Sequence, residues 1–211
     1  MPIPLRVDVS MVIGRLLPFW LLILLLAGCS GMDLREPTAA SWQIHSEQLM
    51  LMHQWSAKGK MAVRTANASE SASLLWQQDN QNTYVQLSGP LGIGATTIYS
   101  DGLELEVHQG NDHTTIDISD PDAMISNTGW DLPLHALSYW LKGIPSPDST
   151  VQRLELDPKT ELLQSLWQND WEVRYDQYKQ FEEFTLPTRL KIQRGATRAK
   201  VIISNWQTSA R

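Results

Sequence analysis

The sequence predicts a mainly β (α+β) fold: a single curved antiparallel sheet forms an unclosed β-barrel, with an N-terminal helix and with two short helices that cap one end of it. Three observations favour this fold class. Short runs of alternating apolar and polar residues recur along most of the chain. Turn pairs such as Asp101-Gly102 separate consecutive runs, as in antiparallel hairpins. Helical patterns are confined to one stretch near the start and two in the middle.

Residues 1–28 have the features of a lipoprotein signal peptide. Arg6 and Arg15 form a basic region, and residues 16–27 are an apolar run too short to span a bilayer. Leu-Ala-Gly then precedes Cys29, the single cysteine, in the pattern of a bacterial lipobox. We therefore expect cleavage before Cys29 and a covalent lipid on its thiol, with no other cofactor.

The residue after Cys29 predicts the membrane in which the lipoprotein is anchored. Ser30 rather than aspartate follows Cys29, which by resemblance to enterobacterial-type lipoproteins implies the periplasmic face of the outer membrane. Translation can begin at Met1 or at Met11, because a basic region follows either one. An ordinary secretory peptide with a chance cysteine is the alternative. With Cys29 lipidated, no disulfide can form within the chain, so the core alone must hold the fold.

Residues 29–211 are enough for one domain with a substantial core. They carry 15 basic and 22 acidic residues, a net charge of −7, which disfavours nucleic acid and electrostatic docking on anionic membranes. Eight of the nine tryptophans lie in this part. They predict either a tryptophan-rich core or an aromatic-lined cavity for an apolar ligand, and composition does not separate the two.

Residues 29–40 are small and polar and are assigned to a lipidated tether, and residues 41–211 to one folded domain. Ser41 suits the N-cap of a helix that runs to about residue 54. Strands separated by turn residues follow this helix. The expected strands are residues 57–65, 72–78, 84–88, 96–99, 103–107 and 114–118.

Two short helices are expected in the middle of the chain. Residues 120–122 (Asp-Pro-Asp) suit the start of a helix that ends at Gly129. A second helix runs over residues 133–142 and stops at Gly143. Further strands are expected over residues 151–156, 162–168, 171–175, 188–193 and 199–205. We expect residues 180–187 to form a loop.

The sequence lacks the common motifs of enzymatic chemistry. It has no G-x-S-x-G elbow, no phosphate-binding glycine loop and no zinc-ligand spacing. Gly92-Ile93-Gly94 leads into a strand rather than a helix. His108 and His113 can approach each other across a hairpin, but such a pair is more often solvated surface. We therefore expect neither an enzyme nor a metal site.

The connection over residues 88–94 is unusual because it carries apolar residues where loops are commonly polar. Pro90 suits position i+1 of a type I turn and Gly92 position i+3, which leaves Leu91 at i+2. Two interpretations stay open. Leu91 either folds back onto the rim of the core or forms an apolar tip that enters a membrane or another apolar partner.

An ordered set of segments resembles a known family. After the lipobox and the N-terminal helix come Leu75-Trp76-Gln77-Gln78, Pro90-Leu91-Gly92, Trp140-Leu141-Lys142-Gly143-Ile144-Pro145, Trp171-Glu172-Val173-Arg174-Tyr175 and Ser204-Asn205-Trp206. In this order, and over essentially the whole mature chain, the segments closely resemble the LolB family of outer-membrane lipoprotein receptors.

The resemblance implies an unclosed antiparallel barrel with helices as a lid over an apolar cavity. It also implies a receptor that accepts lipoproteins from the periplasmic carrier LolA, binds their acyl chains and inserts them into the inner leaflet of the outer membrane. The family's exposed loop leucine matches Leu91, which would promote release into lipid. We expect a monomer whose partners are LolA, lipoprotein cargo and outer-membrane lipid, and no nucleic acid.

Candidates for lining the acyl-chain cavity are large apolar residues of the expected strands and of the second middle helix. They are Trp76, Leu137, Trp140, Leu141 and Trp171. Two alternatives to the receptor remain. One is a lipid-tethered scaffold lipoprotein of the cell envelope with a filled core. The other is an esterase or glycan hydrolase with an unrecognised site.

Overall fold

A computed structural model describes residues 39–89, 94–117 and 132–208, which all belong to one compact unit, Pro37–Arg211. Three sequence predictions fall outside the described residues: the lipidation of Cys29, the loop tip at Leu91 and the helix over residues 120–129. They stay predictions, as do the boundaries of the signal peptide and the tether.

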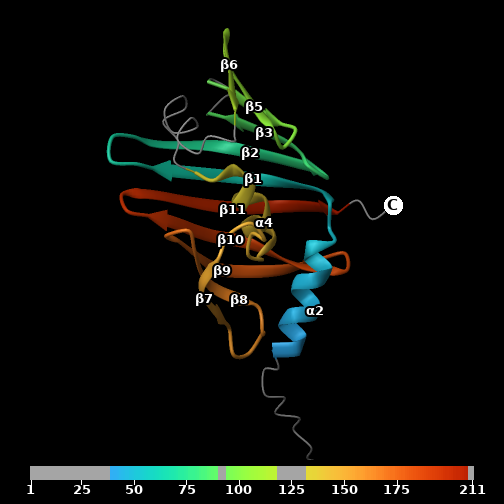
Figure 1. The fold of residues 1–211 in the computed structure, drawn as a ribbon. Coiled ribbons are helices and arrows are strands. Elements are labelled where there is room, and N and C mark those ends of the chain that lie inside the picture. Colours follow the sequence, from blue (N-terminus) through green and yellow to red (C-terminus); the bar gives the residue numbers. More distant parts are fainter. Residues whose placement is uncertain (1–38, 90–93, 118–131, 209–211) are drawn as a thin grey trace, which may run out of the picture. The chain divides into compact units, whose positions relative to one another are not determined.

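The described strands form a single antiparallel sheet in the order β6-β5-β4-β3-β2-β1-β11-β10-β9-β8-β7 (Figure 1). Because β6 and β7 are the two outermost described strands, the sheet is not closed, and the predicted fold class is confirmed. The strands are β1 (Gln54–Arg64), β2 (Ser69–Asp79), β3 (Asn82–Ser88), β4 (Thr96–Ser100), β5 (Glu104–Gln109), β6 (Asp112–Asp117), β7 (Val151–Leu156), β8 (Leu163–Gln168), β9 (Trp171–Phe181), β10 (Phe184–Arg194) and β11 (Thr197–Thr208).

Two helices, α2 (Ala39–Met50) and α4 (Leu134–Lys142), accompany the sheet in the part of the chain that the structure describes. None of the described helices is both long and apolar enough to cross a membrane.

Strands β1 and β11 join the two halves of the sheet at its centre. Ala57 of β1 pairs with Trp76 on one side and with Trp206 on the other. The small side chain of Ala57 leaves room for the indoles to gather around Trp55, whose ring lies 6.1 Å from that of Trp76 and 5.3 Å from that of Trp206. All three indoles are buried, and they form the centre of the core. We call the face that carries them the inner face.

Helix α4 packs against β8, β9 and β10 on the inner face. Pro133 supplies its N-cap with φ −77°, and Gly143 ends it in the left-handed region with φ 84°. The indole Nε1 of Trp140 donates a hydrogen bond to Gln168 Oε1 at 2.9 Å. The Tyr175 hydroxyl donates one to the Trp140 carbonyl at 3.0 Å. These buried contacts fix α4 on its half of the sheet.

The prediction for the N-terminal helix is wrong at both ends. Helix α2 begins before Ser41, which therefore lies inside the helix instead of capping it. The helix ends before residue 54, because Gln54 already begins β1. The extended backbone of β1 instead places Trp55 in the indole cluster.

The loop predicted over residues 180–187 is also wrong. Strands β9 and β10 run through most of it and leave a tight turn at Glu182, which has φ 51°. Pro187 is tolerated in β10 because the pairing register with β9 shifts between Pro187 and Arg189. Its carbonyl accepts a hydrogen bond from Trp206 Nε1 at 2.9 Å, which anchors this irregular point to the core.

Gly59 of β1 has no room for a side chain. The register with β11 shifts between Lys58 and Gly59, and a Cβ on Gly59 would lie 2.0 Å from the carbonyl oxygen of Ile202. We expect Gly59→Ala to lower the free energy of unfolding by about 1–3 kcal/mol, because the two central strands must move apart. Urea unfolding followed by tryptophan fluorescence measures this. Ala62→Ser, at an exposed position of the same strand, is the control, and equal midpoints for the two variants would contradict the close approach.

Candidate functional site

The β1–β6 half of the inner face contains a hollow of about 480 Å³ that α4 does not line. Its volume lies within the range of roughly 300–1,000 Å³ that small-molecule sites occupy. Its wall is mixed, with about as many polar as apolar side chains. The apolar lining residues are Met61, Val63, Ala72, Leu87, Ile98 and Val107.

Strand register brings these side chains to one face. Met61 of β1 pairs with Ala72 of β2, and Ile98 of β4 pairs with Val107 of β5. Because alternate residues of a strand share a face, Val63 joins Met61 on the same side. Alternate residues of neighbouring strands therefore face the hollow, where the apolar side chains stand among polar ones such as Thr96 and Thr114.

Polar residues line the hollow as well, among them Ser71, Thr96, Gln109 and Thr114. Glu70 and Asp112 line it and are exposed to solvent. Gly89 and Gly94, which flank residues 90–93 in the sequence, also line it. A wall with both apolar and polar side chains suits a ligand that has an apolar chain and a polar end.

The five predicted cavity residues lie in the packed core. Trp76 is 2% exposed, Leu137 3%, and Trp140, Leu141 and Trp171 1% each. The structure brings Trp140 and Trp171 together, with ring centroids 6.2 Å apart, whereas Trp76 belongs to the central indole cluster. None of the five lines the hollow. Their contact with an acyl chain stays a prediction.

Sequence reasoning missed the residues that do line the hollow. The alternation in β1, where Met61 and Val63 are separated by Ala62, is a signal that the first two share a face. It does not say which part of that face a helix covers. That depends on where α4 docks, which local patterns do not encode.

Lys142 is a buried cation that joins the two described helices. It is 4% exposed, and its Nζ donates hydrogen bonds to the carbonyl of Leu49 at 2.9 Å and to that of Met52 at 3.2 Å. These carbonyls lie at the C-terminal end of α2, where the helix lacks donors and its dipole favours a cation. Lys142 is the last residue of α4, so this contact ties α4 to the end of α2.

The stability of the protein should rise in mild alkali because of Lys142. Burial lowers the pKa of Lys142 from 10.5 to about 8. As the pH rises through this range the folded state loses the proton before the unfolded state does, so the free energy of unfolding increases with pH. We expect a gain of about 2 kcal/mol between pH 7 and pH 9.5, measured by urea unfolding at both values.

The control is Lys142→Met, in which this gain should vanish. Burial raises the pKa of Tyr175 and of Tyr178, so these two groups oppose the effect only once unfolded tyrosine ionises, near pH 10. The comparison therefore stops at pH 9.5. Equal slopes with pH in the wild type and in Lys142→Met would show that Lys142 does not titrate in this range.

Residues 53–206 match the model of a protein family described as outer membrane lipoprotein LolB. An outer-membrane lipoprotein LolB of Pseudomonas fluorescens is 33% identical over 189 residues, which cover 87% of this chain and 91% of that protein. One from Alkalilimnicola ehrlichii is 36% identical over 199 residues, covering 92% and 96%.

Two solved structures have a similar fold. A LolA superfamily protein from Nitrosomonas europaea superposes with a TM-score of 0.51 at 11% identity, covering 82% of this chain and 94% of that one. A DUF1329 family protein from Desulfovibrio piger gives a TM-score of 0.51 at 11% identity, covering 83% and 94%. At such low identity the likeness concerns the fold alone.

Proposed function

The chain belongs to the LolB family of outer membrane lipoproteins, and from this premise we propose that it is a receptor that accepts lipoproteins from the periplasmic carrier LolA and inserts them into the inner leaflet of the outer membrane. As a family member it is a lipid-anchored protein of the Gram-negative outer membrane. The observation that carries the receptor role is the partly apolar hollow on the inner face. No covalent chemistry on the cargo is part of the proposal.

The hollow supplies what lipoprotein transfer requires. Removing an acyl chain from an apolar environment costs about 0.8 kcal/mol per methylene, so a long chain costs on the order of 10 kcal/mol to expose to water. A chain that passes from carrier to membrane therefore needs an apolar surface throughout. The apolar side chains of the hollow, which include Leu87, Ile98 and Val107, offer such a surface, and its polar side chains accommodate the peptide end of the cargo.

We assign the five buried apolar residues to the deeper part of the same site. Trp140 of α4 contacts Trp171 of β9, and Leu137 and Leu141 are buried residues of the same helix, so these four form one apolar cluster of the core. Trp76 lies near the hollow. It pairs with Val85 of β3, and Val85 pairs in turn with Ile98 of β4, which lines the hollow. Acyl chains would then extend from the hollow toward the core.

Two further assignments rest on the sequence. Cys29 carries the lipid that anchors the receptor, and Leu91 is the apolar residue of a loop that enters the membrane and promotes release of the cargo into the lipid. The lining glycines Gly89 and Gly94 support the second assignment, because they connect the segment that contains Leu91 to the hollow. The proposed partners are LolA, lipoprotein cargo and membrane lipid, with the receptor acting as a monomer.

The experiment that tests the receptor role is transfer. The soluble domain that lacks Cys29 is mixed with LolA loaded with a lipoprotein, and the cargo is followed by affinity capture of each protein. We expect the cargo to move onto this chain and then, when liposomes are added, into the lipid. Cargo that stays on LolA would contradict the proposal and favour the scaffold lipoprotein instead.

A further inference from the structure

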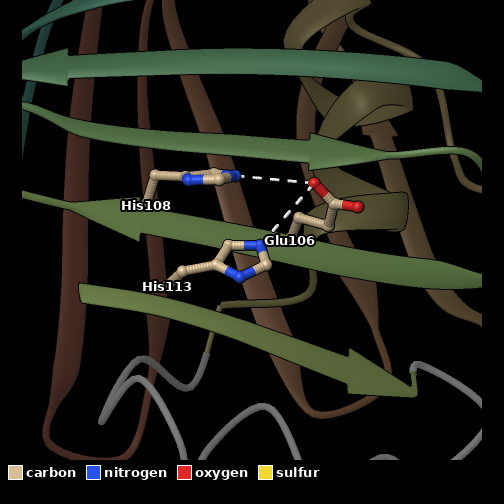
Figure 2. A group of neighbouring side chains, drawn as sticks. All are labelled: Glu106, His108 and His113. Atoms are coloured by element: carbon tan, nitrogen blue, oxygen red, sulfur yellow. Dashed lines mark hydrogen bonds and ion pairs between the residues drawn. The ribbon is translucent and has the colours of Figure 1, made fainter. Parts of the chain in front are cut away.

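Three side chains of the β5–β6 hairpin converge (Figure 2). They lie on the face of the sheet opposite the hollow, the outer face, because the alternate residues Val107 and Thr114 line the hollow. The Glu106 carboxylate Oε2 lies 3.5 Å from His108 Nε2 and 3.8 Å from His113 Nε2. The two imidazole rings lie 4.3 Å apart between centroids. One donor atom from each residue falls within 4.8 Å of the other two.

The hairpin itself produces this convergence. Glu106 and His108 are two apart on β5 and so share a face, and His113 of β6 is the direct partner of His108 across the ladder. Gly110, with φ 61°, closes the short turn between the strands. The alternate residue Val107 points to the other side and lines the hollow. The site on the outer face therefore depends on short-range structure alone.

The donor set fits a borderline transition-metal ion. Zn²⁺ takes imidazole nitrogen and carboxylate oxygen at about 2.0–2.2 Å in tetrahedral geometry, which places neighbouring donors about 3.4 Å apart. The distances from Glu106 to the two histidines are close to that spacing. The three side chains are 43–50% exposed, so an ion and a water ligand can reach them. Mg²⁺ and Ca²⁺ prefer all-oxygen sites and are disfavoured here.

We propose that Glu106, His108 and His113 bind one divalent transition-metal ion of the Zn²⁺ class, with solvent completing its coordination. The ion would join β5 to β6, the outermost described strand on this side of the sheet. Because the opposite face of the same two strands lines the hollow, the ion would also brace part of that wall. The proposal goes beyond lipoprotein transfer and does not depend on it.

The test is a zinc titration of the full-length protein in detergent after treatment with a chelator. Isothermal titration calorimetry with ZnCl₂ should show one ion per chain, and MgCl₂ should give no binding heat. Glu106→Gln and His113→Asn should each weaken Zn²⁺ binding by at least about tenfold, because a lost ligand costs at least as much as a lost outer-shell partner. Glu106→Gln is isosteric, so it keeps the test decisive if His113→Asn fails to fold.

His135→Asn is the matched control. His135 is also an exposed histidine beside a carboxylate, with Nδ1 3.2 Å from Asp148 Oδ2, but this pair offers only two donors. Its variant should bind Zn²⁺ as tightly as the wild type. The proposal would be overturned if the wild type does not bind one Zn²⁺ per chain. It would also be overturned if Glu106→Gln and His113→Asn leave the Zn²⁺ affinity unchanged.

Discussion

Placing a glutamate in the hollow by Ala72→Glu is expected to weaken binding of an acyl chain roughly 60-fold. Ala72 is half-buried and lines the hollow beside Met61. A carboxylate there keeps its water, so a chain loses contact with that part of the wall. If about three methylenes are displaced at about 0.8 kcal/mol each, the loss is about 2.4 kcal/mol. Competition of a fatty acid against a fluorescent acyl probe measures it.

The adjacent residue gives the matched control. Ser73 lies next along β2 on the outer face, is exposed, and pairs with Lys60. Ser73→Glu adds the same charge to the same strand and should leave the affinity for the probe unchanged. Ala72→Leu, which adds volume without charge, should cost far less than Ala72→Glu. Equal affinities for the two glutamate variants would show that acyl chains bind elsewhere, and the buried cluster around Trp140 would become the first place to look.

Hairpins were predictable because their signals are local. Residue pairs such as Asp101-Gly102 and Asn169-Asp170 mark turns, and the structure has positive φ at Gly102 and at both residues of the second pair. The strands β9 and β10 were expected at residues 171–175 and 188–193, but the part of their hairpin within residues 180–187 was missed because Pro187 argues against a strand. It is accommodated only by a register shift and a hydrogen bond from Trp206, a residue far away in the sequence. No local pattern carries that information.

The site was harder to predict than the fold for a related reason. Large apolar residues such as Trp140 and Trp171 are typical of the lining of an apolar cavity, yet in the structure they pack against each other in the core. The hollow is instead lined by ordinary strand residues such as Val63 and Val107, and no residue of α4 lines it. The hydrogen bonds from Lys142 to the end of α2 could not be predicted from the sequence either, because their acceptors are backbone carbonyls distant in the chain.

Leu91→Glu is expected to block delivery of cargo to liposomes by more than about 100-fold while leaving uptake from LolA intact. A leucine side chain is stabilised in the apolar part of a bilayer and a charged one is not, a difference of about 3 kcal/mol. The hollow does not require Leu91 for its apolar lining, which Met61, Ile98 and other described residues supply. Transfer to liposomes and capture of cargo from LolA are therefore measured separately on one preparation.

Leu103→Glu separates a specific role of Leu91 from a general effect of charge on an apolar loop. Leu103 follows the Asp101-Gly102 turn and is 75% exposed, so it is a leucine that faces solvent beside a hairpin turn. We expect Leu103→Glu to deliver cargo as the wild type does. If both variants lose delivery, membrane contact is spread over several loops. If Leu91→Glu instead loses uptake or unfolds in urea at a lower midpoint, Leu91 belongs to the rim of the core, and the membrane-entry interpretation is wrong.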